Sequence, residues 1–367
     1  MRATDIFIIG GGPAGLATAI AARQRGFDVV VADGATPPID KACGEGLMPD
    51  GRAALAKLGM SVPEQDSYPF RGIRFVSSGM SVDASFPHGT GIGVRRTVLH
   101  SLMAARAEAA GVTLLWQTPV TGLHNDGVLL GKILVRARWT VGADGGHSLV
   151  RQWAVLDRYQ CDRMRFAFRR HYRIAPWSDC MELHWGPGCQ IYVTPVAADE
   201  VCVALISRNP DLRLDDALPA LPALQARLQA ATPASTERGA ISSTRKLRHV
   251  YDRNVVLVGD ASGMVDAITG EGLCLSFSHA QLLADCLVTG DLKRYQQVHR
   301  KLATRPVLMA RLMLTLEWKA WFRQRVMRAF GSDPRMFADM LAMHVGALSP
   351  VDFAATGLSL GWRVLNA

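Results

Sequence analysis

Residues 5–34 read DIFIIGGGPAGLATAIAARQRGFDVVVADG: a short apolar strand, a glycine turn, an alanine-rich helix and a second strand that ends in an acid. Each glycine of the turn has a separate physical reason. Gly10 lets the chain turn sharply, Gly12 lets the backbone approach a pyrophosphate, and Gly15 lets the helix pack closely on the sheet. The order of these segments predicts a dinucleotide site.

The start of the helix and the end of the second strand support this prediction. The first helical turn offers free N–H groups and a partial positive charge to phosphate. Asp33, about 20 residues after the glycines, can accept hydrogen bonds from the adenosine ribose. A glycine-rich turn without a nucleotide is the alternative, and the complete order of segments disfavours it. The cofactor-binding residues predicted here are Gly10, Gly12, Pro13, Ala14, Gly15, Asp33 and Gly34.

Composition indicates a globular protein with two or three structural units, because 367 residues with 49% hydrophobic and 20% charged side chains can bury a large core. Residues 6–22 lack charge, but their glycines fit a strand and a helix better than a signal peptide or membrane span. Seven cysteines without CxxC spacing favour a reducing compartment and argue against a zinc site. We therefore expect a cytoplasmic protein without a metal.

The net charge of +9 is concentrated near the C-terminus. Between Lys293 and Arg328 there are ten Lys or Arg residues against one acid, Glu317, interleaved with Leu, Met, Trp and Phe. This pattern predicts basic amphipathic helices. Either their apolar stripe covers the core, or it forms a surface for lipid or a carrier protein and makes peripheral membrane contact. Nucleic acid is not an expected partner, because no recognition motif accompanies the charge.

The segment DKACGEGLMPDGRAALAKLG, residues 40–59, predicts a loop that leads into a helix. Small residues flank Cys43, so the backbone at Gly44 can lie close to a flat ligand. A buried apolar role is the alternative for this cysteine. Further along, Arg95 stands where the chain enters a helix and is suited to a phosphate or ribose.

The middle of the chain predicts short strands and a second glycine turn. We expect a strand-rich region from about 68 to 86, two strands in 112–116 and the following TPVTGL with Pro119 at their join, and another strand at 128–135. In WTVGADGGHSLVR, residues 139–151, Asp144 either binds a ribityl or ribose hydroxyl or caps the helix that begins near Ser148.

A third glycine site spans residues 255–287. A buried strand ends at Gly259-Asp260, and Gly270, Glu271 and Gly272 open an apolar helix that includes Leu273. Between the second and third sites, segments such as CQIYVTPV and EVCVALI, with a polar helix near residues 211–230, predict a separate antiparallel layer.

Three motifs carry a family resemblance. GGGPAGLA (10–17), VGADGGHSLVR (141–151) and VLVGDASGMVDAITGEG (256–272) resemble the FAD fingerprints of the p-hydroxybenzoate hydroxylase-type flavoproteins. KACGEGLMPDG, DAITGEG and the C-terminal helical extension are similar to the geranylgeranyl reductase group, with flavin-dependent halogenases as more distant relatives. The resemblance implies FAD, with Asp33 on the ADP half, Asp144 and Asp260 near the ribityl and pyrophosphate, and the helix after Gly272 directed at the isoalloxazine.

The resemblance also implies the architecture. We expect an α/β (α+β overall) protein with a Rossmann-like FAD-binding domain, an inserted antiparallel β-sheet substrate domain and a helical C-terminal extension. The predicted ranges are 1–65, 91–155 and 250–300 for the FAD-binding domain, 66–90 and 156–249 for the β domain, and 301–367 for the helical region. The remaining predicted cofactor contacts are Cys43, Gly44, Arg95, Val120, Gly145, Gly259, Gly270 and Leu273.

Departures from each group bear on the chemistry. The halogenase WxWxIP motif is absent, since Trp-Ser-Asp at 177–179 does not match it. QIYVTPV, with Tyr192 and Pro195, looks like a shortened form of the strand that lines a lipid channel in the reductases, without its tryptophan. Aromatic hydroxylases usually carry Gln or a related residue where this chain has Glu271, and many lack the Cys-Gly-Glu loop.

These comparisons favour a reductase. An ene reductase needs a hydride from flavin N5 and a proton from the other side of the alkene, and the resemblance makes Cys43 the candidate proton donor. We expect reduction of C=C bonds in an isoprenoid, polyene or other long apolar substrate. His184, Trp185, Tyr192 and Pro195 are the predicted substrate contacts.

Other functions stay open. An aromatic monooxygenase acting through a C4a-hydroperoxide needs a dry pocket with polar anchors, which His184, Trp185 and Tyr192 could supply unless they only pack within strands. A flavin-binding protein without turnover is the third alternative. Because no second nucleotide fold is predicted, electrons would come from NAD(P)H docking transiently or from a separate reductase.

Overall fold

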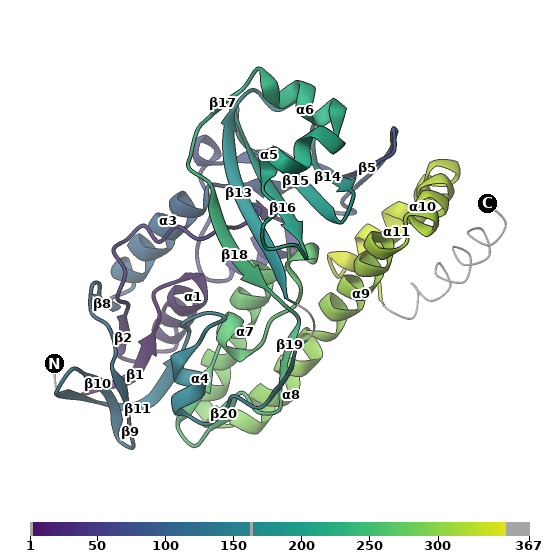
Figure 1. Cartoon of the computed structure of the whole chain (residues 1–367). Coiled ribbons are helices and arrows are strands. Elements are labelled where there is room, and N and C mark those ends of the chain that lie inside the picture. Colours follow the sequence, from purple (N-terminus) through teal and green to yellow (C-terminus); the bar gives the residue numbers. More distant parts are fainter. Residues whose placement is uncertain (1–2, 162–163, 350–367) are drawn as a thin grey trace.

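The glycine-rich stretch forms a β–α–β unit in the computed structural model, which describes residues 3–161 and 164–349 (Figure 1). Strand β1 (Ala3–Ile9) leads through the turn into α1 (Pro13–Arg23), and the chain returns as β2 (Val29–Ala32). β1 pairs in parallel with β2 and with β11 (Ile133–Gly142). The carboxyl ends of these strands therefore meet at one edge of the sheet.

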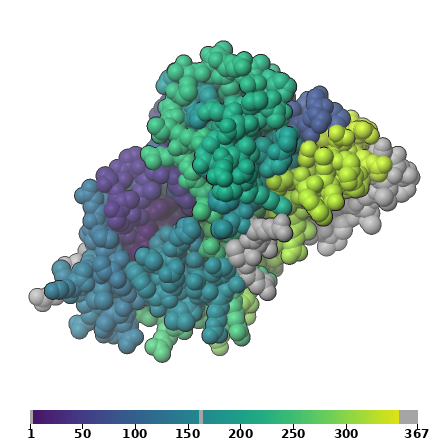
Figure 2. All heavy atoms as spheres, in the orientation of Figure 1, coloured from purple at the N-terminus to yellow at the C-terminus, as the bar shows by residue number. Residues whose placement is uncertain are grey.

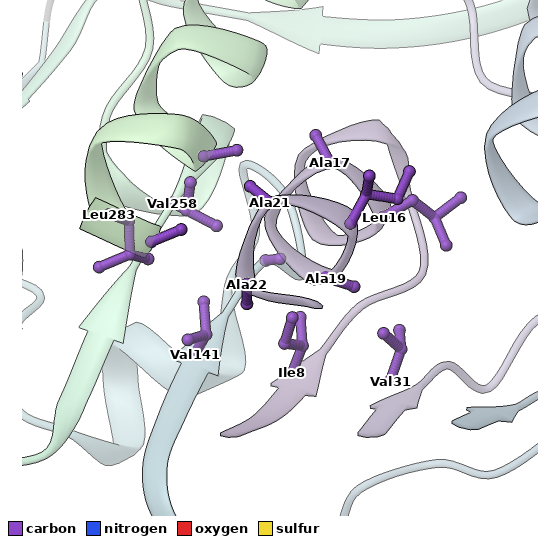
Figure 3. Packing of buried hydrophobic residues seen from close by; sticks show 14 of the residues in the cluster. Ile8, Leu16, Ala17, Ala19, Ala21, Ala22, Val31, Val141, Val258 and Leu283 are labelled. Atoms are coloured by element: carbon purple, nitrogen blue, oxygen red, sulfur yellow. The ribbon is translucent and has the colours of Figure 1, made fainter. Parts of the chain in front are cut away.

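Small side chains let α1 lie close to this sheet. Ala17, Ala19, Ala21 and Ala22 are fully buried. Figure 3 shows Ala19 and Ala22 between the helix and the strand that carries Ile8. Bulkier residues would hold the helix axis further from the strands, and the glycine turn would then lose its position.

This first sheet is mainly parallel, with antiparallel pairing at one edge and in a branch that pairs with β11. Its order is β20 (Tyr251–Asp252), β21 (Val255–Leu257), β11, β1, β2 and β8 (Thr113–Leu115), and β10 (Gly127–Leu130) joins β11 to β9 (Gly122–His124). The helices of this unit are α1, α2 (Pro49–Ala56), α3 (Arg96–Ala109), α4 (Leu149–Trp153) and α7 (Gly272–Thr289). Short 3₁₀ turns are η1 (Glu64–Asp66), η3 (Gly259–Ser262) and η4 (Ala267–Thr269).

The second sheet is mostly antiparallel and lies above the first in Figure 1. Its order is β17 (Thr232–Pro233), β13 (Arg165–Arg173), β16 (Glu200–Ser207), β15 (Cys189–Ala197), β14 (Cys180–Gly186), β5 (Gly72–Ser77) and β6 (Met80–Ser85), and β18 (Arg238–Ser242) also pairs with β13. Two small sheets connect the units: β3 (Gly46–Leu47), β7 (Gly91–Gly93) and β4 (Tyr68–Phe70), and β12 (Tyr159–Cys161) with β19 (Arg245–Leu247).

Both faces of the second sheet are covered, because successive side chains of a strand point to opposite faces. Ile191 and Val193 of β15 pack with α5 (Leu214–Ala217), η2 (Leu218–Ala220) and α6 (Pro222–Gln229). Tyr192, between them, belongs to a different cluster with residues of the C-terminal helices. The sheet is therefore a shared wall between two apolar clusters.

The C-terminal helices place their apolar stripe on this sheet, which is the first of the two alternatives predicted for them. Three of them do so, α9 (Thr304–Trp318), α10 (Ala320–Ser332) and α11 (Pro334–His344), and these form the yellow-green arm in Figures 1 and 2. The fourth, α8 (Leu292–Leu302), packs on α7 instead, with Leu292 and Tyr295 in the first core. Met309, Phe330 and Phe337 are buried against the second sheet. Trp318 and Trp321 stay 71% and 58% exposed, with Lys319 lying over the Trp318 ring.

The predicted fold class is confirmed, and three local predictions are wrong. Pro119 does not join two strands, because Gln117 adopts φ +54° and the chain from 116 to 121 forms a turn and irregular structure between β8 and β9. Residues 128–135 do not form one strand, because Gly131 adopts φ +61° and turns the chain between β10 and β11. The helix expected near 211–230 is divided into α5, η2 and α6, with Pro222 starting α6. The predicted domain ranges stay predictions. Among the described helices, α7 alone is long and apolar enough to span a membrane, and it packs extensively on α1.

Candidate functional site

The glycines of the first turn have different surroundings: two are closely packed and one faces open space. A Cβ on Gly10, which has φ +110°, would lie 2.5 Å from the Ala143 carbonyl oxygen, and one on Gly15 would lie 1.9 Å from that of Gly10. No atom lies within 4 Å of the Cβ position of Gly12, the N-cap of α1. Two of these glycines are therefore required by packing, whereas the third faces room for a ligand.

The three glycine motifs meet at this turn. Gly10 contacts Ala143 of the second motif, and a Cβ on Gly259 of the third motif would lie 2.5 Å from Cβ of Ala14. Asp33 braces the turn, because its Oδ2 accepts a hydrogen bond from Gly11 N (2.7 Å) and its Oδ1 accepts one from Ala35 N (2.8 Å). Next to it, Gly34 lies near Pro119, and Val120 packs against the first core.

Asp144 caps the N-terminus of α4, which was one of its two predicted roles. Its Oδ2 accepts hydrogen bonds from Leu149 N (2.7 Å) and Val150 N (3.1 Å). Its Oδ1 is buried and has no partner among the described residues. Gly145 follows with φ +81°. One carboxylate oxygen is thus available to a ligand.

The third motif opens the long helix α7. Asp260 forms an ion pair with Lys41 (Oδ2–Nζ 3.2 Å), so the loop that carries Cys43 is tied to this motif. Gly270 adopts φ +69°, and the Cβ positions of Gly270 and Gly272 have no neighbour within 4 Å. No side chain caps α7, so the backbone N–H of Leu273 is one of the free donors of its first turn.

Glu271, between these glycines, is buried and joins α7 to the C-terminal helices. Its Oε1 lies 3.1 Å from Nη2 of Arg305 in α9, and its Oε2 lies 3.6 Å from Nδ1 of His344 in α11. Burial raises the pKa of this carboxyl, and His344 and Arg305 oppose that rise. Ion pairs of Glu271 therefore link the start of α7 to the C-terminal arm.

Together these features fit a bound dinucleotide such as FAD. Two uncapped helix starts offer N–H groups, and glycines leave open space beside both. Asp144 Oδ1 and Arg96 Nη1 are among the buried polar atoms that have no protein partner in the described part of the chain. Buried polar groups are nearly always hydrogen-bonded, so these atoms indicate contacts that the polypeptide does not supply.

Arg95 was predicted to contact a phosphate or ribose, but the structure makes the adjacent Arg96 the better candidate for a cofactor contact. The Arg95 guanidinium pairs with Glu200 of β16. The Arg96 side chain is buried, and burial lowers its pKa against the opposing charges of groups that include Asp260 and Glu45. No helical pattern in the sequence separates these adjacent arginines. The role of Arg95 stays a prediction.

Cys43 lies in a loop pressed against the second sheet. Thr194 of β15 donates a hydrogen bond to the Gly44 carbonyl oxygen (2.7 Å), and Glu45 N donates to Cys43 Sγ (3.4 Å). Burial raises the pKa of this thiol, with the positive charge of Arg96 as the largest opposing influence. The thiol is therefore protonated at neutral pH. In the described part of the chain no cysteine forms a disulfide.

A buried polar cluster behind this loop was missed by the sequence analysis. Glu45 Oε2 lies 2.6 Å from Nε2 of His171 in β13, and Arg169 in the same strand pairs with Asp40. Glu45, His171 and Cys202 lie close enough to ligate a metal ion. The guanidinium of Arg169, 3.9 Å from Glu45, makes this a poor cation site. His171 carries no motif that could have indicated it.

The predicted substrate residues do not share one face. Trp185 and Tyr192 belong to the cluster under the C-terminal helices, and the Tyr192 hydroxyl donates to the Ile268 carbonyl oxygen (2.6 Å) just before the third glycine turn. His184 contacts Glu182 instead (2.9 Å). Pro195 precedes a register irregularity and lies against Gly93. Their contact with a substrate stays a prediction.

Comparison with known families decides the identity of the cofactor site. The model of a family described as an FAD binding domain matches residues 3–290. The chain belongs to this FAD-binding family. The match includes all three glycine motifs, so FAD is the cofactor of this oxidoreductase, as predicted.

Curated relatives of the FAD-binding family are named as reductases. The menaquinone reductase of Mycobacterium tuberculosis (strain H37Rv) is 29% identical over 318 residues, which cover 79% of this chain and 78% of that protein. Digeranylgeranylglycerophospholipid reductase 2 of Methanosphaera stadtmanae is 26% identical over 300 residues, which cover 74% of this chain and 75% of that protein. The resemblance to the geranylgeranyl reductase group is confirmed.

Solved structures of FAD-family proteins share the fold. A flavoprotein/dehydrogenase from Cytophaga hutchinsonii superposes with a TM-score of 0.80 at 18% identity, and the match covers 94% of this chain and 93% of that protein. A geranylgeranyl bacteriochlorophyll reductase-like protein from Thermoplasma acidophilum gives 0.74 at 18% identity, with coverage of 100% and 98%. A probable FAD-dependent monooxygenase from Pseudomonas aeruginosa gives 0.72 at 21% identity, with coverage of 86% and 97%. The fold thus does not choose between reduction and oxygenation.

Proposed function

We propose that this FAD-dependent oxidoreductase reduces C=C bonds of a long apolar substrate, an isoprenoid or a polyene. The observation that carries the proposal is the half-buried Cys43 thiol, held in a loop that Lys41 ties to the third glycine motif. Geranylgeranyl groups and the side chain of menaquinone are both polyprenyl chains, so the named relatives support the same substrate class.

In this proposal the protein supplies the proton. Reduced FAD, when bound, supplies the hydride to one alkene carbon. The Cys43 S–H bond breaks as a C–H bond forms at the other carbon, and the resulting thiolate then takes a proton from water. Burial raises the pKa of Cys43, so the sulfur keeps its proton until the transfer to the alkene carbon. The glycine turns and Arg96 hold the cofactor and leave the thiol free for this step.

The apolar chain of the substrate would lie between the second sheet and the C-terminal helices. Seven of the fourteen methionines are buried in that cluster: Met48, Met309, Met313, Met327, Met336, Met340 and Met343. Methionine side chains are flexible and adapt to irregular apolar shapes. Trp185 and Tyr192, the proposed substrate contacts, stand in the same cluster.

The exposed rings of Trp318 and Trp321, flanked by Lys319 and Arg325, are the proposed contact with an anionic membrane surface or an acidic carrier protein. Such a contact would deliver an apolar substrate to the adjacent cluster. NAD(P)H or a separate reductase remains the proposed source of electrons, and a cytoplasmic location the proposed compartment.

The test uses FAD-loaded protein that is reduced with dithionite without oxygen and mixed with geranylgeraniol. The expected product is heavier by two hydrogens, and in D₂O it carries deuterium from the solvent. Cys43→Ser should slow product formation at least about 100-fold, the lower range of a general acid. Cys286→Ala, at the far end of α7, is the control and should keep the rate. Oxygen-dependent incorporation of ¹⁸O₂ into a phenol, without alkene reduction, would instead support the monooxygenase.

A further inference from the structure

Glu45 occupies a backbone conformation that suits glycine. Its φ is +58°, in the left-handed region. Both of its neighbours in the sequence, Gly44 and Gly46, are glycines, yet the left-handed position carries a glutamate. A non-glycine residue in this region is strained and persists where its surroundings hold it. The side chain must therefore provide contacts that a glycine at this position would lack.

The Glu45 carboxylate makes these contacts on two elements far away in the sequence. Its Oε2 lies 2.6 Å from His171 Nε2 in β13, and its Oε1 accepts a hydrogen bond from Arg96 N at the start of α3 (2.9 Å). The carboxylate is 1% exposed. One side chain thus joins the loop after Cys43 to both the second sheet and the first unit.

The orientation of His171 is fixed as well. Arg169 Nη1 lies 3.0 Å from His171 Nδ1, and Ser235 Oγ lies 2.8 Å from the same nitrogen. A guanidinium only donates hydrogen bonds, so Nδ1 must accept. This assigns the ring proton to Nε2, which donates to Glu45. The ring can therefore hold the carboxylate in one position.

The backbone of Glu45 transmits this position to the thiol. Glu45 N donates to Cys43 Sγ (3.4 Å), and the Glu45 carbonyl oxygen accepts from Val94 N (2.9 Å). The charged groups around the thiol are Arg96 from α3, Arg169 from β13 and Glu45 itself. Movement of the carboxylate would change both the place of the sulfur and the charges that it meets.

We propose that Glu45 and His171 are positioning residues for Cys43, and that their buried hydrogen bond holds the strained loop which presents the thiol. The catalytic consequence rests on the proposed function, since it requires Cys43 to be the proton donor. The positioning itself is independent of turnover. The experiment therefore measures the thiol directly.

The readout is the pH dependence of iodoacetamide alkylation in the FAD-loaded protein, followed by mass spectrometry. Trypsin releases Cys43 in the peptide 42–52, which contains no other cysteine. Glu45→Gly removes the carboxylate and relieves the backbone strain, so the variant should fold. We expect Cys43 alkylation at pH 8 to rise at least tenfold and the midpoint of its pH profile to fall by about one unit or more.

Three further variants separate positioning from general damage. Arg253→Gly relieves a similar φ of +49° in the turn between β20 and β21, at the edge of the first sheet, and should leave the profile unchanged. His171→Leu removes the donor that holds the carboxylate but keeps the carboxylate, so Cys43 alkylation at pH 8 should rise more than threefold without the full fall of the midpoint. His171→Gln, which keeps a donor for the carboxylate, should stay within threefold of the wild type. A wild-type profile in Glu45→Gly would overturn the proposal.

Turnover distinguishes this proposal from the proposed function. If alkylation changes as expected but the wild-type enzyme reduces no alkene, the positioning stands and the ene-reductase function fails. If the wild type reduces an alkene and Glu45→Gly does so at the same rate, the positioning role is overturned and the proposed function stands.

Discussion

Gly12→Ser and Gly15→Ala should separate cofactor binding from folding at the same turn. Gly12 has φ −72° and no atom within 4 Å of its Cβ position. It is also the N-cap of α1, where serine is among the most favourable residues. The serine variant should therefore fold at least as well as the wild type, but its side chain would enter the space next to the free N–H groups of α1.

The expected magnitudes follow from this geometry. Gly12→Ser should change the free energy of unfolding of the apoprotein by less than about 0.5 kcal/mol. The serine hydroxyl competes for the N–H groups that would bind pyrophosphate, so FAD affinity should fall at least tenfold, or about 1.4 kcal/mol. In Gly15→Ala, the new Cβ would lie 1.9 Å from the Gly10 carbonyl oxygen, over 1 Å inside the 3.0 Å limit of real contacts. Such overpacking costs about 1–3 kcal/mol.

Two assays test both statements. Urea unfolding of the apoproteins measures stability, and titration with FAD, followed by flavin fluorescence, measures affinity. Gly122→Ser, at the start of β9, is the control outside the three glycine motifs, because its backbone is not left-handed and the new Cβ would meet only Leu129 at 3.6 Å. The reasoning is refuted if Gly12→Ser binds FAD as tightly as the wild type, or if it destabilises the apoprotein as much as Gly15→Ala.

Three further predictions concern single residues. Arg96→Ala should raise the Kd for FAD at least tenfold and Arg95→Ala less than threefold, because Arg95 already pairs with Glu200; the reverse order would support the sequence prediction. Burial lowers the pKa of His299 from 6.5 to about 4, so the unfolded state binds a proton first as the pH falls below 6.5, and the wild type should be about 2 kcal/mol less stable at pH 5 than at pH 7.5 through this group. Urea unfolding of His299→Gln at both pH values should show that this pH-dependent loss of stability is absent from the variant. Phe277→Ala should lower the free energy of unfolding by about 3–5 kcal/mol, measured with urea, because the ring is fully buried; a loss below 1 kcal/mol would contradict its place in the core.

Local physics made the first unit predictable. Gly10 and Gly15 are needed because a Cβ would collide with neighbouring backbone, and this requirement is encoded in the turn itself. The helix predicted to begin near Ser148 is α4, and Asp144 caps it as one of its two predicted roles, with Oδ2 accepting from Leu149 N. Apolar strands, glycine spacing and caps act over a few residues, so the sequence alone determined the β–α–β unit, the FAD motifs and the fold class.

Contacts between distant segments were decided only by the tertiary structure. Arg95 and Arg96 are adjacent, and only the packing of α3 sends one to Glu200 and buries the other. Glu45 meets His171 across 126 positions of sequence, through pairing of strands that no local pattern specifies. The sequence determined which residues can bind a dinucleotide. The arrangement of the two sheets determined which polar groups lie beside Cys43, because buried charges depend on the partners that folding brings to them.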